Sequence, residues 1–113
     1  MSALEQFDIS VEVELRRARE AGQSGNAGKV RTSARRAVGC AMRFRLEKYP
    51  RPDYPTDTMQ QIRRFASEKH IPPDVREVLL RLQARISTAF ESPSTDPIND
   101  AITIISYIRS ELQ

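Results

Sequence analysis

Hydrophobic residues recur every three or four positions along most of the chain, a spacing that places side chains on one face of an α-helix. Five such patterns cover nearly the whole sequence. Their apolar positions are, in chain order, Leu4, Phe7, Val11, Leu15 and Ala18; Val30, Ala34, Ala37, Ala41 and Phe44; Met59, Ile62 and Ala66; Val75, Val78, Leu79, Leu82 and Ile86; and Ile98, Ala101, Ile102, Ile105, Ile108 and Leu112.

The residues between these patterns are typical of helix ends. Glycines at positions 22, 25 and 28 end the first helix, and Asn26 is placed to cap a second one that runs to about Lys48. Three prolines within residues 49–55 exclude a helix there and predict a stiff loop. Thr56 or Asp57 caps a third helix that ends before position 72. The fourth helix begins at positions 73–74, residues 92–95 interrupt the pattern, and the fifth runs from about Asp96 to the end.

The sequence therefore predicts an all-α fold. No stretch alternates apolar and polar residues as a half-buried strand does. Short links between the helices favour an up-and-down bundle of about five helices that forms one domain over residues 1–113. If the five stripes meet, one core contains Leu15, Ala34, Phe44, Leu82 and Ile105.

Composition excludes several classes of protein. The 113 residues contain one cysteine, Cys40, so no disulfide can form within the chain, and a cytoplasmic location is expected. No apolar run approaches the roughly 20 residues of a membrane span. One cysteine and one histidine cannot form a zinc site, and without strands there is no phosphate-binding loop between a strand and a helix. We expect neither a metal nor a cofactor.

Charge is segregated along the chain. Residues 16–51 carry eleven basic and only two acidic side chains, and fifteen of the eighteen basic residues of the protein are arginines. The planar guanidinium suits carboxylate and phosphate groups better than a lysine ammonium does. Candidate ligand-binding residues lie off the apolar stripe of the second helix: Lys29, Arg31, Arg35, Arg36 and Arg43. Alternatively, these basic residues form a solvent-exposed face and pair with acidic side chains of residues 1–15, which contain four acids and no lysine or arginine.

Small residues interrupt this basic face. Gly39 and Thr32 lie in its middle, where a missing side chain lets another backbone or a ligand come close. Two interpretations remain open. Gly39 allows close helix packing, or it lies in a phosphate pocket bounded by Arg35 and Arg36.

Residues 25–44 carry a family resemblance through the stretch GNAGKVRTSARRAVGCAMRF. It resembles the second-helix segment of small bacterial proteins of the HEPN superfamily (higher eukaryotes and prokaryotes nucleotide-binding), which are compact helical bundles that often form dimers. The resemblance implies nucleotide or RNA binding and a nucleotidyltransferase as protein partner. In many members it also implies a metal-independent ribonuclease motif, in which an arginine precedes a histidine by four to six intervening residues.

His70 formally matches that motif. Five residues separate it from Arg64 and six from Arg63. In a continuous helix, Arg64 and His70 point about 120° apart and Arg63 lies about two turns from His70, so neither pair is poised for catalysis within one chain. The alternative role for His70 is to contact the last carbonyls of the third helix.

Some apolar residues lie outside the stripes. Ile9 and Val13 project away from the first stripe, and Ile104 and Tyr107 project away from the fifth. These residues either contact further helices of the same chain or form a two-fold contact between copies. We predict a homodimer in which at least one of the two pairs lies at the contact.

Together these features predict a non-catalytic binding module for a nucleotide, RNA or acidic protein partner, acting through the arginine-rich second helix and paired, as the resemblance implies, with a nucleotidyltransferase. The alternative function is a metal-independent ribonuclease that uses Arg63 or Arg64 with His70 across a dimer cleft.

Overall fold

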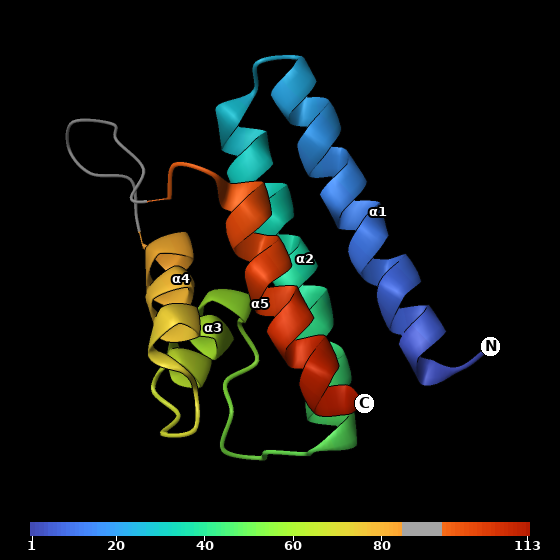
Figure 1. The fold of residues 1–113 in the computed structure, drawn as a ribbon, viewed down its shortest axis with the longest axis vertical. Helices are drawn as coiled ribbons and strands as arrows, with labels where there is room; N and C mark the ends of the chain where they lie inside the picture. The colour runs from blue at the N-terminus through green and yellow to red at the C-terminus, as the bar shows by residue number, and fades with distance from the viewer. Residues whose placement is uncertain (85–93) are drawn as a thin grey trace.

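The first two helices form an antiparallel hairpin. The structure, a computed structural model, describes residues 1–84 and 94–113. Helix α1 (Ala3–Gln23) begins at Ser2, whose side chain accepts from the Glu5 amide in a capping box, and α2 (Ala27–Lys48) begins at the predicted cap Asn26. Gly25 joins them with φ of 75°, a conformation that favours glycine. In Figure 1, α1 forms one side of the molecule.

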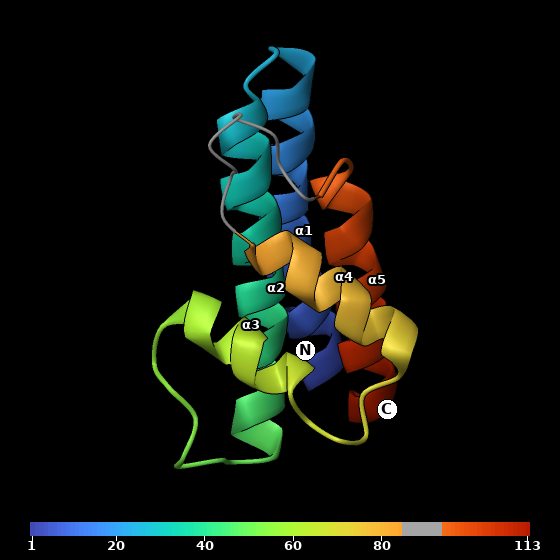
Figure 2. The same cartoon turned by 90° about the vertical axis from the view of Figure 1, so that its left-hand side faces the viewer.

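Helices α3 (Thr58–Ala66) and α4 (Pro73–Gln83) are short and lie across the long helices (Figure 2). Asp57 caps α3, as the sequence predicts, because its carboxylate accepts from the Gln60 amide at 3.0 Å. Arg76 of α4 closes the other end of α3, donating to the carbonyls of Ala66 and Glu68 at 2.8 Å. The two helices are thereby held as a unit.

Helix α5 (Pro97–Leu112) packs beside α2 and runs in the same direction, because α3 and α4 return the chain (Figure 1). Its N-cap is Asp96, which agrees with the predicted start of the fifth helix at about this residue. The described residues contain no strand, so the prediction of an all-α bundle of about five helices is confirmed. Among the described residues, no helix combines the length and hydropathy needed to cross a bilayer.

One hydrophobic core joins all five helices. Leu15, Ala34, Leu82 and Ile105 are buried in it, as predicted. Phe44 is only half-buried and packs edge-to-face against the Phe7 ring, with 5.6 Å between ring centroids. The predicted core position at residue 86 lies outside the described residues.

The buried face of α5 differs from the prediction. Ile102, expected in the core, is 40% exposed, whereas Ile104 is fully buried. Because α5 packs against α1, α2 and α4, its buried face is wider than one stripe and includes Ile104 and Ile108. Ile104 is therefore not available for a contact between copies, and Tyr107 packs against Phe65 within the chain.

The proline-rich loop is fixed by its tyrosine. Tyr54 is buried, and its hydroxyl donates to Glu68 at 2.8 Å. The guanidinium groups of Arg51 and Arg64 lie 5.0 and 5.5 Å from the centre of the Tyr54 ring, within the range of cation–π contacts. Arg51 and Arg64 also pair with Asp53. The loop between α2 and α3 is thus anchored to the end of α3.

Candidate functional site

The arginines of α2 divide into those that hold the fold together and those that do not. Arg35 belongs to the first group. Its Nε donates to the carbonyl of Leu82 at 2.8 Å and its Nη2 to that of Ala84 at 2.9 Å, which satisfies the C-terminal end of α4. Burial, helped by the charge of Arg31, lowers the pKa of Arg35. We therefore remove Arg35 from the candidate ligand-binding residues.

Arg36 and Arg43 belong to the second group and line a groove between α2 and the start of α3. The groove has a volume of about 530 Å³. Both side chains are exposed, and neither forms an ion pair within the described residues. The other groove residues are Glu14, Gly39, Cys40, Leu46, Glu47, Thr56, Thr58 and Gln61.

Gly39 sets the width of this groove. A Cβ atom at this position would lie 2.9 Å from Cγ2 of Thr58, closer than packed side chains allow. The glycine therefore lets α3 begin close to α2, as the helix-packing interpretation predicts. A second depression of about 300 Å³ is bounded by both Arg35 and Arg36, so Arg36 lies between two hollows; its other residues are Thr32, Thr58 and Met59.

The charge of the groove is mixed. Glu14 and Glu47 lie in its wall, and Glu14 pairs with Arg17 at 3.0 Å on its own helix. Burial raises the pKa of the Cys40 thiol, which keeps the thiol neutral and makes it a poor nucleophile. The groove thus offers guanidinium groups for binding and no activated nucleophile at the cysteine.

The remaining candidates on α2 lie toward its N-terminal end. Lys29 is exposed and Arg31 is half-buried. Arg31 lines a separate depression of about 310 Å³ together with Ser94 and Thr95. Lys29 therefore extends the line of Arg36 and Arg43 along α2, whereas Arg31 lies on another side of the helix.

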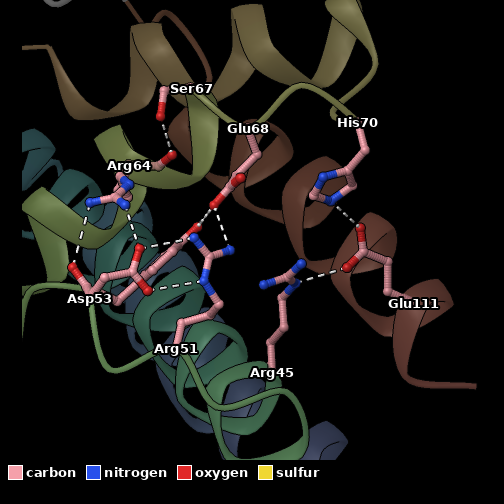
Figure 3. Close-up of polar contacts among 9 residues, drawn as sticks. Arg45, Arg51, Asp53, Arg64, Ser67, Glu68, His70 and Glu111 are labelled. Atoms are coloured by element: carbon pink, nitrogen blue, oxygen red, sulfur yellow. Dashed lines mark hydrogen bonds and ion pairs between the residues drawn. The ribbon is translucent and has the colours of Figure 1, made fainter.

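Arg63 and Arg64 do not converge with His70 in one chain. Arg64 Nη2 lies 2.5 Å from Asp53 Oδ2, and Arg63 Nε donates to Gln83 Oε1 at 2.7 Å. Figure 3 shows Arg64 and His70 at opposite ends of a row of polar side chains. The matched motif therefore brings no arginine to His70 within the described chain.

His70 also does not contact the last carbonyls of α3, so that prediction is wrong. The helix ends at Ala66, and His70 lies in the following loop with its ring turned toward α5. Ser67 donates to the carbonyl of Arg64 at 2.6 Å, and Arg76 donates to that of Ala66. These groups occupy the role expected of the histidine.

Instead, His70 faces a pair of charged residues that the sequence did not reveal. Its Nε2 atom lies 3.2 Å from Glu111 Oε1, and Arg45 Nε donates to Glu111 Oε2 at 2.8 Å (Figure 3). Arg45 is only 7% exposed, and its guanidinium lies 4.7 Å from the centre of the Phe65 ring. With Tyr49, these three polar residues line an open depression of about 320 Å³.

Glu111 is held as a carboxylate. Burial raises the pKa of Glu111, but the hydrogen bond from Arg45, the neighbouring Tyr107 hydroxyl and the charge of Arg45 lower it by more, so the net shift is downward. Its Oε1 atom is buried and has no hydrogen bond of good geometry, although His70 lies within ion-pair distance. The carboxylate therefore lies beside the imidazole without a hydrogen bond that fixes the orientation of the ring.

One feature of the sequence could have predicted this cluster: Arg45 and Glu111 are charged residues on the buried, apolar faces of their helices. Arg45 follows Ala41 by one helical turn, and Glu111 follows Ile108 in the same way.

The described residues contain no group of three or more cysteine, histidine, aspartate or glutamate side chains that could hold a metal ion. Comparisons with protein-family models, curated proteins and solved structures found no match to this chain.

Proposed function

We propose that the protein binds a phosphate-bearing ligand, RNA or a nucleotide, on the basic face of α2. The observation that carries the proposal is the pair Arg36 and Arg43, two exposed guanidinium groups without described ion-pair partners in one groove. Lys29, seven residues before Arg36, extends the same face of α2, whereas Arg31 lies about 140° around the helix. The HEPN resemblance of residues 25–44 supports the same class of ligand.

Phosphate suits the groove for two reasons. A guanidinium forms two parallel hydrogen bonds to a phosphate, which a lysine ammonium cannot do. Thr56 and Thr58 line the groove at the start of α3, so their hydroxyl groups can also donate to a phosphate. Glu14 and Glu47 would repel a ligand that carries negative charge along the whole groove. They therefore favour a ligand whose phosphate groups lie at the two arginines.

The test is RNA affinity as a function of salt. For single strands, the slope of log affinity against log salt is about −0.7 per phosphate contact. The double variant Arg36→Met and Arg43→Met is expected to lower affinity and to reduce the slope by about 1.4, because two contacts are lost. Arg16→Met is the matched control, since Arg16 is exposed on α1 outside the groove.

Three results would contradict the proposal. One is a wild-type protein that binds neither RNA nor nucleoside triphosphate at low salt. Another is an unchanged slope in the double variant. The third is binding of an acidic protein, such as a nucleotidyltransferase, at the same two arginines with no competition from RNA or nucleotide.

A second candidate function is phosphodiester cleavage at His70. The observation that favours it is the contact of His70 with Glu111 beside the buried guanidinium of Arg45 in an open depression. A histidine beside a carboxylate is suited to acid–base catalysis, and a guanidinium stabilises the charge that develops on phosphate. Here Arg45 takes the place that the sequence motif gave to Arg63 or Arg64.

Cleavage of RNA in the presence of a metal chelator tests this candidate. We expect His70→Gln to abolish cleavage and to leave RNA affinity unchanged. Glu111→Gln, which keeps an acceptor for Arg45, is expected to slow cleavage at every pH. Arg64→Met tests whether Arg45 or Arg64 is the arginine that takes part in cleavage. This variant is expected to abolish cleavage only if Arg64 takes part, either in the same chain as His70 or from a second copy. A wild-type protein that leaves RNA intact would refute this function and leave the binding proposal standing.

A further inference from the structure

Three exposed cations lie in a line along one side of α2. Lys29, Arg36 and Arg43 follow one another at intervals of seven residues, so each lies about 10 Å further along the helix and only about 20° further around it. None of the three forms an ion pair among the described residues. The next positions at this spacing, Gly22 and Pro50, lie outside α2. These three residues therefore form a complete cation line, about 21 Å long.

Hollows alternate with the members of this cation line. Thr32 lies between Lys29 and Arg36 in the sequence and lines the depression of about 300 Å³. Gly39 lies between Arg36 and Arg43 and lines the groove of about 530 Å³. The order along α2 is thus cation, hollow, cation, hollow, cation. A nucleic acid strand has a similar alternation, because its charged phosphates are separated by uncharged sugars and bases, and single strands bind in grooves whose positive charges follow the backbone.

The groove between the two arginines is not itself suited to phosphate. Glu14 of α1 and Glu47 of α2 line it, so a phosphate held midway between Arg36 and Arg43 would lie beside carboxylates. A sugar hydroxyl or a base amino group, in contrast, can donate a hydrogen bond to a carboxylate. A nucleoside triphosphate carries its charges in one short run, which does not match cations that are separated by such hollows.

We propose that the ligand of α2 is a single strand of RNA that lies along the helix and crosses both hollows, with phosphates at Lys29, Arg36 and Arg43 and sugars and bases between them. This inference rests on the function proposed above and specifies its ligand. Phosphates of a stacked strand follow one another at about 3.4 Å, so the spacing of two cations corresponds to about three steps and the whole cation line to about seven phosphates. A duplex does not match, because its two backbones wind around an axis and leave a straight line of cations.

The length of the strand tests the proposal. Labelled uridylate strands of about four and about eight nucleotides reach two and three members of the cation line, respectively. Fluorescence anisotropy at several salt concentrations is expected to show a slope of log affinity against log salt that is steeper by about 0.7 for the long strand, because one phosphate contact is added. The slope distinguishes a further contact from the larger number of positions in which a long strand can bind. Unlabelled uridine triphosphate is expected to compete more weakly than the long strand.

Lys29→Met is expected to remove this difference between the strands. The slope for the long strand falls by about 0.7, and the slope for the short strand stays unchanged, because Arg36 and Arg43 still bind it. Arg31→Met is the matched control, since it removes one positive charge from the same part of α2, about 140° around the helix from Arg36. It is expected to leave both slopes as in the wild type. Circular dichroism checks that each variant keeps the helical fold.

Several results would overturn this proposal and leave a phosphate ligand at Arg36 and Arg43 in place. They are equal slopes for the two strands, an unchanged slope in Lys29→Met, and equal losses in Lys29→Met and Arg31→Met. A long strand that binds as tightly after pairing with its complement would also overturn it. A protein that binds neither strand and no uridine triphosphate would instead contradict the proposed function, and this inference would fail with it.

Discussion

The neighbouring residues Arg35 and Arg36 give the sharpest test of how the arginines are used. Arg35 makes two hydrogen bonds, 2.8 and 2.9 Å long, to the carbonyls of Leu82 and Ala84. Hydrogen bonds to a charged group contribute about 1.5 to 3 kcal/mol each. Because the site is only partly buried and water can replace the guanidinium, we take the lower figure. Arg35→Met, which keeps most of the apolar stem, is then expected to lower the free energy of unfolding by about 3 kcal/mol.

Urea unfolding followed by circular dichroism measures this difference directly. Arg36→Met is the control one position away, and it is expected to change the free energy of unfolding by less than about 0.5 kcal/mol. Arg35→Lys retains the charge but presents a single ammonium, so an intermediate loss is expected. If Arg35→Met and Arg36→Met had equal stability, Arg35 would not be the cap of α4. Arg35 would then return to the set of candidate ligand-binding residues.

Three further predictions concern the core, the α2–α3 contact and acid stability. Leu82→Ala is expected to lower the free energy of unfolding by about 2 to 5 kcal/mol in urea, because the side chain is fully enclosed; a loss below 1 kcal/mol would place it outside the core. Gly39→Ala is expected to destabilise the wild-type protein, because the added Cβ meets Cγ2 of Thr58. In a Thr58→Ser background, which lacks this atom, the same substitution is expected to be stabilising. Additive effects of the two substitutions in a double-mutant cycle would contradict this prediction. Burial raises the pKa of Asp100, but hydrogen bonds from Arg81 and the buried Ser94 lower it by more, so the net shift is downward. The ionised Asp100 therefore stabilises the fold above about pH 4, and this stabilisation is lost as the pH falls through the lowered pKa. Acid titration of Asp100→Asn is therefore expected to show a flatter loss of stability below about pH 4, and an unchanged profile would exclude this carboxylate as a cause.

The helices and most of their ends were predictable because their causes are local. Asn26, Asp57 and Asp96 each accept from a backbone amide three residues further on, which is a property of the segment itself. The buried face of a helix depends instead on how many neighbours it has. That number explains why Ile104 was placed on the surface and Ile102 in the core. The spacing of apolar residues predicts which side of a helix is buried. It does not predict how much of the helix surface is buried when three other helices pack against it.

The candidate sites were less predictable because they join distant segments. Arg45 and Glu111 are separated by 66 positions, and no local pattern reports that α2 and α5 run in the same direction. The match of Arg64 to His70 depended on sequence spacing, whereas the loop after α3 turns His70 toward α5. Gly39 was recognised correctly as a point of close approach, since a glycine in the middle of a helix has a backbone cost that needs a local reason.

The two uses of arginine on α2 support the binding proposal better than the net charge does. Arg35 and Arg45 point toward α4 and α5, and each ends on a carbonyl or a carboxylate that needs a donor. Arg36 and Arg43 are two turns apart on one line, about 10 Å along the axis, with no such acceptor among the described residues. These two exposed arginines add nothing to the core, and Glu14 and Glu47 offset their charge without pairing with them. A bound phosphate would contact both guanidinium groups in the folded state only, so adding ligand is expected to raise the unfolding midpoint of the wild type and not that of the double variant Arg36→Met and Arg43→Met.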